Sequence, residues 1–168
     1  MQLIEIVEGG DIETIDGEPM KTDSALVLEC IRGGELYYNM RKYGKFSAKV
    51  AFHFFSQVVD AICHMHKVGY CHRDLKPWNI MLADDLCSIK VIDFSYSSPL
   101  KIENCPQFLR GYLSGTKQFM APEQFESAMD DFSKLDVWAC GVLLLNMLTL
   151  EFAFDSPNDP RFKSLDVE

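Results

Sequence analysis

Residues 72–79, His-Arg-Asp-Leu-Lys-Pro-Trp-Asn, gather polar groups of three complementary kinds. Asp74 supplies a carboxylate that can accept the proton of a hydroxyl, and Lys76 supplies a cation that can neutralise a phosphoryl group. Asn79 and Asp93 supply oxygen atoms of the kind that bind Mg²⁺. An isolated Asp in a polar loop is more often a turn former, but this spacing indicates a site for phosphoryl transfer.

Helices are expected on both sides of this loop. Ser47 is a suitable helix cap, and the apolar residues after it recur at intervals of three or four, so that they share one helical face through His66 (Val50, Phe54, Val58, Ile62 and Met65). Residues 67–69 end this helix. A strongly apolar helix is predicted over residues 135–148, and a short one over residues 36–43.

Strands are expected at the start of the chain and directly after the loop. Residues 3–7 alternate apolar and acidic side chains and residues 25–30 are a second candidate, which together predict a hairpin with a polar connection over residues 9–24. Residues 80–82 and 88–92 predict two short strands joined by a turn. Few strands followed by helices indicate an α+β fold.

The composition is that of one domain with a core. The chain has 168 residues, of which 48% are hydrophobic and 24% are charged, close to the average of soluble globular proteins. Its net charge of −9 argues against nucleic acid as a partner, because phosphate backbones require a surplus of Lys and Arg. Nine acidic residues stand in residues 1–35 against two basic ones, which we interpret as a solvated surface.

Cysteine spacing and hydropathy argue against secretion and against a membrane partner. None of the six cysteines shows the spacing of a zinc site. The first residues carry an acid where a signal peptide requires a base. The longest apolar stretch, residues 137–145, is shorter than the roughly 20 residues that a membrane span needs. We therefore expect reduced thiols and a location in the cytoplasm, or alternatively the nucleus.

At residues 72–79 the chain resembles the protein kinases, because the catalytic-loop pattern His-Arg-Asp-Leu-Lys-Pro-x-Asn is complete. Four further segments follow in the order of that family. Residues 26–31 resemble the hinge strand, and residues 93–95 (Asp-Phe-Ser) resemble the magnesium-binding motif. Residues 121–123 (Ala-Pro-Glu) resemble the end of the activation segment, and residues 136–142 resemble the central buried helix.

The resemblance implies a protein-kinase-like fold of the α+β class. Residues 1–31 would be a remnant of the amino-terminal lobe and the hinge. Residues 32–168 would be the mostly helical catalytic lobe, incomplete at its carboxy-terminal end.

The resemblance also implies a reaction, the transfer of the γ-phosphoryl of ATP to a protein hydroxyl. Asp74 would accept or orient the proton of that hydroxyl, and Lys76 would neutralise the phosphoryl charge. Asn79 and Asp93 would hold Mg²⁺. A Lys two positions after the catalytic Asp is typical of serine/threonine kinases, so the expected partner is a protein with a Ser or Thr acceptor, with a regulatory protein as a further partner.

The same resemblance assigns residues to the nucleotide. Glu29 and Ile31 would present backbone groups to adenine, Leu28 would guard the pocket behind it, and Met81 would form its floor. Glu35 would meet the ribose or a basic substrate side chain. An exposed carboxylate at the start of a helix is an equally good interpretation of Glu35.

Several parts of the family pattern are missing or altered. Neither a Gly-x-Gly-x-x-Gly loop nor a Val-Ala-x-Lys strand precedes the hinge, so we expect far weaker ATP binding than a complete kinase shows. Ser95 replaces the glycine of Asp-Phe-Gly, and because Ser avoids positive φ we expect a bias in the conformational flip of this motif. Glu123 would need a buried Arg partner near the last helices. Because the only Arg after Arg110 is Arg161, we expect Glu123 to lack this partner, which would weaken the activation segment.

The amino-terminal remnant has too few strands to cover its own apolar side chains. A two-stranded sheet is marginal on its own. We expect Ile4, Ile6, Leu26 and Leu28 to form an exposed apolar face that lowers the solubility of the chain.

Arg73 is typical of family members in which a phosphorylated activation loop controls activity. Residues 93–123 contain four candidate hydroxyls for this modification (Ser97, Ser98, Ser114 and Thr116). The last of them corresponds in position to the residue that contacts Asp74 and Lys76, which makes it the weakest candidate.

Two other classes of function compete with a protein kinase. The missing amino-terminal half favours a pseudokinase-like scaffold, whose helical lobe only docks partners, whereas the intact site residues favour catalysis. A small-molecule phosphotransferase of kinase-like fold is disfavoured by Lys76, Thr116 and residues 121–123, which build a peptide platform. Trp78 is unusual for the family, and the sequence offers no physical account of it.

Overall fold

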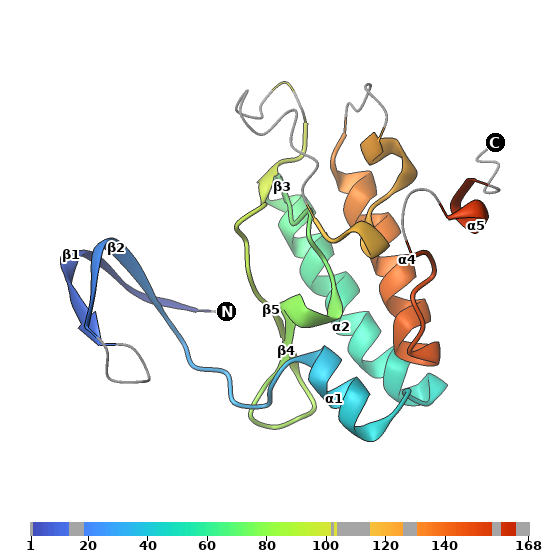
Figure 1. Cartoon of the computed structure of the whole chain (residues 1–168), viewed down its shortest axis with the longest axis horizontal. Helices are drawn as coiled ribbons and strands as arrows, with labels where there is room; N and C mark the ends of the chain where they lie inside the picture. Colours follow the sequence, from blue (N-terminus) through green and yellow to red (C-terminus); the bar gives the residue numbers. More distant parts are fainter. Residues whose placement is uncertain are drawn as a thin grey trace. The chain divides into compact units, whose positions relative to one another are not determined.

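The structure is a computed structural model that describes residues 2–13, 19–101, 103, 115–125, 131–155 and 159–163. They belong to two compact units, Met1–Arg32 and Gly33–Glu168 (Figure 1). The assignment of residues 1–31 to an amino-terminal lobe remains a prediction.

The first unit is an antiparallel hairpin of β1 (Leu3–Glu13) and β2 (Pro19–Leu28). The predicted hairpin is confirmed, but its strands are longer than expected. Residues such as Thr22, which pairs with Gly10, lie in the predicted polar connection over residues 9–24 and instead continue the ladder. Because backbone groups form the ladder, a polar side chain does not end it.

One face of this hairpin is apolar and exposed, as predicted. Ile6 pairs directly with Leu26, and the two are 57% and 64% exposed. Ile4 and Leu28 are also exposed. The expected effect on solubility remains a prediction.

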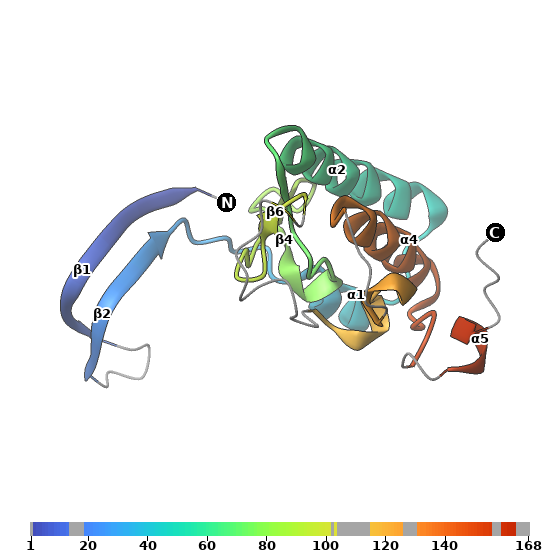
Figure 2. The same ribbon diagram turned by 90° about the horizontal axis from the view of Figure 1, so that it is seen from above.

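The second unit contains α1 (Leu36–Tyr43), α2 (Ala48–Lys67), α4 (Ser133–Thr149) and α5 (Pro160–Lys163). The two long helices, α2 and α4, pack side by side (Figure 1 and Figure 2). Their predicted positions are confirmed to within two residues.

The expected cap of α2 is present, but its buried face is rotated from the expected one. The N–H of Val50 donates to Ser47 Oγ at 3.4 Å. Val50 itself is 39% exposed, and the buried stripe is Ala51, Phe54, Val58 and Ile62. Successive helical residues are rotated by about 100°, so Ala51 continues this stripe and Val50 lies beside it.

Two small antiparallel sheets frame the polar loop. β3 (Tyr70–Cys71) pairs with β6 (Ser98–Pro99), and β4 (Ile80–Leu82) pairs with β5 (Ile89–Val91). The loop between β3 and β4 ends in a short 3-10 helix, η1 (Pro77–Asn79). Two further 3-10 helices, η3 (Lys117–Phe119) and η4 (Pro122–Phe125), precede α4.

The core of the second unit joins the helices to the loop. Leu75 and Ile80 from the loop region are buried together with Val58 of α2 and Leu143 of α4. The expected α+β class with a mostly helical second part is confirmed. Among the described residues, no helix is both long and apolar enough to cross a membrane.

Candidate active site

Asp136, at the start of α4, fixes the backbone of the polar loop. Its carboxylate is 1% exposed and accepts hydrogen bonds from the backbone N–H groups of His72 and Arg73, each at 2.9 Å. His66 Nε2 lies 2.8 Å from the same carboxylate. Because a buried carboxylate requires such partners, the backbone that immediately precedes Asp74 has a defined position.

The His72 side chain ties the loop to the segment after β5. Its Nδ1 accepts from the backbone N–H of Asp74 at 3.3 Å, so Nε2 carries the proton and donates to the carbonyl of Ile92 at 3.0 Å. The ring of Phe94 lies 5.4 Å from the ring of His72. One imidazole thereby holds together the two segments that carry the candidate site.

Arg73 adopts a backbone conformation that side chains other than glycine seldom take. Its φ is 67°, in the left-handed region, and its guanidinium stacks over the ring of Phe132 at 4.6 Å. Such conformations persist where the surrounding contacts determine them, and here Asp136 and Phe132 supply those contacts. The expected role of Arg73 toward a phosphorylated segment remains a prediction.

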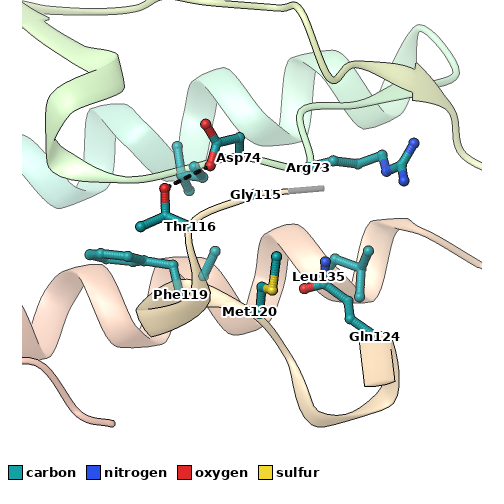
Figure 3. Close-up of a pocket in the computed structure, with 10 residues that line it drawn as sticks. Arg73, Asp74, Gly115, Thr116, Phe119, Met120, Gln124 and Leu135 are labelled. Carbon is teal, nitrogen blue, oxygen red and sulfur yellow. Dashed lines mark hydrogen bonds between the residues drawn. The ribbon is translucent and has the colours of Figure 1, made fainter. Parts of the chain in front are cut away.

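The Asp74 carboxylate is the centre of a hydrogen-bond network. Lys76 Nζ lies 2.6 Å from Oδ2, and Asn79 Nδ2 donates to the same oxygen at 3.1 Å. Thr116 Oγ1 donates to Oδ1 at 3.2 Å, drawn as the dashed line in Figure 3. Lys76 Nζ also donates to Thr116 Oγ1 at 2.9 Å. The structure therefore brings together three of the predicted site residues, and the expected contacts of Thr116 are present.

A glycine allows Thr116 to reach this network. Gly115 has a φ of 116°, and a Cβ at this position would lie 2.9 Å from the carbonyl oxygen of Arg73. The turn is closed by Phe119, whose N–H donates to the carbonyl of Thr116 at 2.8 Å. Between this segment, the loop and α4 lies a small hollow, lined by the residues in Figure 3.

Asp93 is placed beside the loop by the pairing of β4 with β5. Ile80 pairs with Val91, and the N–H of Ile92 donates to the carbonyl of Asn79 at 2.9 Å. The hydrogen bond from the Ser95 hydroxyl is the main cause that lowers the pKa of Asp93, and the charge of Lys76 contributes further. The positive charge of Lys76 thus favours the ionised form of Asp93.

Ser95 does not need the conformational freedom of the glycine that it replaces. The residue with positive φ in this motif is Asp93, at 60°, and Ser95 is not among the described residues with positive φ. This conformation therefore places no backbone strain on Ser95. The expected bias in a conformational flip remains a prediction.

The oxygen atoms of Asn79 and Asp93 are of the kinds that bind a hard cation. Asn79 directs Nδ2 toward Asp74, so its Oδ1 is on the other side of the amide. Asp93 Oδ2 accepts no hydrogen bond within the described part of the chain, because both hydrogen bonds from Ser95 go to Oδ1. One carboxylate oxygen and one amide oxygen are ligands that Mg²⁺ accepts.

The residues expected around adenine fall in both units. Leu28, Glu29 and Ile31 belong to the first unit, and Glu35 and Met81 belong to the second. Glu29 Oε1 accepts from the backbone N–H of Gln2 at 2.5 Å. Their roles toward adenine remain predictions.

Within the second unit, Glu35 and Met81 are neighbours, because they form an isolated antiparallel bridge. Glu35 is exposed and stands at the start of α1, without a side-chain capping bond. This position agrees with the interpretation of Glu35 as a helix-start carboxylate.

Sequence reasoning missed Asp136 and His66 as residues that hold the site. The sequence placed His66 on a helix but gave no sign of its contact with Asp136. The available signal was Asp136 itself, an acid one turn into an otherwise apolar helix, because buried acids are almost always paired. Its partners could not be found, since they lie more than sixty residues away.

The structure describes three of the four candidate phosphorylation sites. Ser98 is 1% exposed and its hydroxyl contacts Cys71 Sγ at 3.4 Å, and the Ser97 hydroxyl is also buried. Thr116 is engaged by Lys76 and Asp74. Ser114 lies outside the described residues. Among the three described candidates, none presents a free, exposed hydroxyl in this conformation.

Comparison with known proteins agrees with this geometry. The family model described as "Protein kinase domain" matches residues 3–167. "Serine/threonine-protein kinase SRK2J" from Arabidopsis thaliana is 36% identical over 141 residues, which cover 83% of this chain and 40% of that protein. "Serine/threonine-protein kinase SAPK3" from Oryza sativa subsp. indica and "Serine/threonine-protein kinase SRK2A" from Physcomitrium patens are also 36% identical over 83% of the chain.

The chain spans about two fifths of the length of these curated relatives. The family match nevertheless covers nearly all of its residues. It includes the loop in which Asp74, Lys76 and Asn79 share one network. This chain belongs to the protein kinase family.

Proposed function

We propose that this chain carries the catalytic loop of a serine/threonine protein kinase, which transfers the γ-phosphoryl of ATP to a hydroxyl of a protein substrate. The observation that carries this proposal is the Asp74 carboxylate, buried yet bound to the Lys76 ammonium at 2.6 Å. Relatives named serine/threonine-protein kinases support the acceptor type.

The chain's own residues account for the movement of the proton. Asp74 Oδ1 accepts a hydrogen bond from the Thr116 hydroxyl, and an acceptor Ser or Thr hydroxyl has the same chemistry. In the reaction the substrate hydroxyl donates a hydrogen bond to Asp74. Asp74 thereby orients the hydroxyl oxygen, and it takes the hydroxyl proton as this oxygen attacks the γ-phosphoryl group. Lys76 stays beside the carboxylate and offers its charge to the transferred phosphoryl group.

We further propose ATP and Mg²⁺ as cofactors, with Asn79 Oδ1 and Asp93 Oδ2 as the protein ligands of the metal. Bound Mg²⁺ would neutralise the charge of the phosphates. Because this sequence contains no glycine-rich loop, we expect the chain to bind ATP far more weakly than a complete kinase does.

The proposed partner is a protein with a Ser or Thr acceptor, and the proposed location is the cytoplasm or the nucleus. The location is supported by the cysteines, since the five in the described part of the chain are free.

The test measures transfer of radiolabelled phosphate from millimolar ATP with Mg²⁺ to peptide pools that differ only in a Ser, Thr or Tyr acceptor. We expect transfer to Ser and Thr, and a loss of about 100-fold or more in Asp74→Asn, the range typical of a lost general base. Asp60→Asn is the matched control, because Asp60 is an exposed carboxylate on α2. Circular dichroism checks that both variants keep their helices.

Full transfer by Asp74→Asn, or transfer to Tyr alone, would contradict the proposal. Complete absence of transfer by the unchanged chain would also contradict it, and would favour the scaffold.

A further inference from the structure

We propose that Ser95 is a positioning residue that holds the Asp93 carboxylate for a divalent cation and thereby sets the affinity of that site. This inference rests on the proposed function, because it assumes that Asp93 binds the metal. It assigns a role to the residue at which this sequence departs from the Asp-Phe-Gly pattern.

Ser95 contacts Asp93 through two donors. The hydroxyl of Ser95 donates to Asp93 Oδ1 at 2.5 Å, and its backbone N–H donates to the same oxygen at 3.2 Å. Two donors on one oxygen fix the plane of the carboxylate as well as its direction. Oδ2 is left with its lone pairs available to a cation.

Nothing else in the described part of the chain restrains this carboxylate by a hydrogen bond. Asp93 is exposed and its backbone has a φ of 60°. Asp74, in contrast, is buried and receives side-chain bonds from Lys76, Asn79 and Thr116. The orientation of the Asp93 carboxylate therefore depends on Ser95 alone, whereas the orientation of the Asp74 carboxylate is shared among three neighbours.

This dependence matters because Mg²⁺ and Mn²⁺ favour ligands with a fixed octahedral geometry. A carboxylate that rotates freely loses conformational freedom when it binds a metal, and this loss weakens binding. Hydrogen bonds behind a ligand remove that penalty in advance, and their loss typically lowers metal affinity about 10–100-fold. In Ser95→Ala the backbone donor remains, so we expect an effect at the lower end of this range.

The experiment measures Mn²⁺ binding to the whole chain from the electron paramagnetic resonance signal of free Mn²⁺, without nucleotide. We expect Ser95→Ala to bind Mn²⁺ about 10-fold more weakly than the unchanged chain. Ser95→Thr keeps the hydroxyl and should stay within about twofold. Asp93→Asn should lose the saturable binding.

Ser88→Ala is the matched control. The Ser88 hydroxyl donates to Asp85 Oδ2 at 2.7 Å in the exposed turn between β4 and β5, so its removal breaks the same kind of bond elsewhere. We expect this variant to bind Mn²⁺ like the unchanged chain. Urea unfolding of each variant excludes a loss of affinity through unfolding.

Equal or tighter Mn²⁺ binding by Ser95→Ala would overturn the inference, as would equal weakening in Ser88→Ala. The lack of saturable binding by the unchanged chain through the millimolar range would overturn it too. The result separates from the proposed function, because Mn²⁺ binding requires no phosphoryl transfer. If the chain binds Mn²⁺ in a manner that depends on Ser95 but transfers no phosphoryl group, the proposed kinase reaction is refuted and this inference stands.

Discussion

Two buried thiols, Cys71 and Cys140, make the stability of the fold depend on pH. Burial is the main cause that raises the pKa of Cys71 to about 11 and the pKa of Cys140 to about 12, from an ordinary value of 9.0. In the unfolded chain both thiols are in water and ionise near that ordinary value. The folded state therefore keeps two protons that the unfolded state releases as the pH rises.

We expect the free energy of unfolding to be independent of these thiols below about pH 9 and to fall between about pH 9 and 11, since releasing protons favours the unfolded state. Each thiol contributes of order 2 kcal/mol to this fall. Urea unfolding at about pH 8 and about pH 11 measures it.

In Cys140→Ala the free energy of unfolding should fall less with pH than in the unchanged chain. In Cys87→Ala, which removes an exposed thiol, it should fall as much as in the unchanged chain. If Cys140→Ala and Cys87→Ala lose stability with pH to the same degree, the buried thiols are not the cause.

At the scale of elements, Trp78 has the physical account that the sequence did not offer. Its ring stacks on Tyr37 of α1 with 4.1 Å between centroids and lies 6.2 Å from Phe152. It also meets Phe119 of η3 edge to face at 6.3 Å. Trp78 thus connects the loop to α1 and to the turn that carries Thr116.

The contact of Gly33 with the end of β4 gives a prediction at this scale. A Cβ at Gly33 would lie 2.4 Å from the carbonyl oxygen of Leu82 and 2.5 Å from that of Ala83, and both are backbone atoms. The substitution Gly33→Ala must separate these segments, so we expect it to destabilise the fold by about 1–3 kcal/mol.

Gly141→Ala is the opposite case in the same unit. Gly141 lies inside α4 with no atom within 4 Å of a Cβ at its position, so alanine should stabilise the helix by about 1 kcal/mol. Thermal unfolding compares the two. A Gly33→Ala variant as stable as the unchanged chain would contradict the packing that the structure describes.

The elements differ in how far sequence could predict them. Periodicity located α2, because a face that packs on a core repeats with the helical turn, whereas α4 was located by its long apolar run. Periodicity misplaced Val50, since neighbouring positions both fit an apolar pattern and only packing decides between them. The length of the hairpin could not be predicted, because its ladder continues through polar residues such as Glu8 and Ser24.

The site shows the same division between local and distant contacts. The spacing of Asp74, Lys76 and Asn79 predicted a network that forms within six residues of chain. The contact of His72 with Asp136 joins positions 64 residues apart, for which a single sequence holds no signal.

At the scale of the whole molecule, both units expose apolar surface. In the second unit α4 is apolar on all sides, and Val137 and Leu145 are 65% and 42% exposed. Helices of this kind are usually covered on every face. In the first unit the exposed face contains Ile4, Ile6 and Leu26. Surfaces of this kind promote association, which a net charge of −9 opposes only in part.

The paired substitution Ile6→Thr with Leu26→Thr tests the contribution of the hairpin. The two side chains face each other across the strands, and threonine keeps the strand propensity of a β-branched residue while it removes apolar area. We expect a larger monomeric fraction in sedimentation and weaker binding of a dye that reports apolar surface.

Val7→Thr is the control, because adjacent strand residues point to opposite faces, and it should change neither measurement. An unchanged chain that is already monomeric, melts sharply and binds no dye would show that this face is covered in solution and that the exposed strands are not what limits solubility.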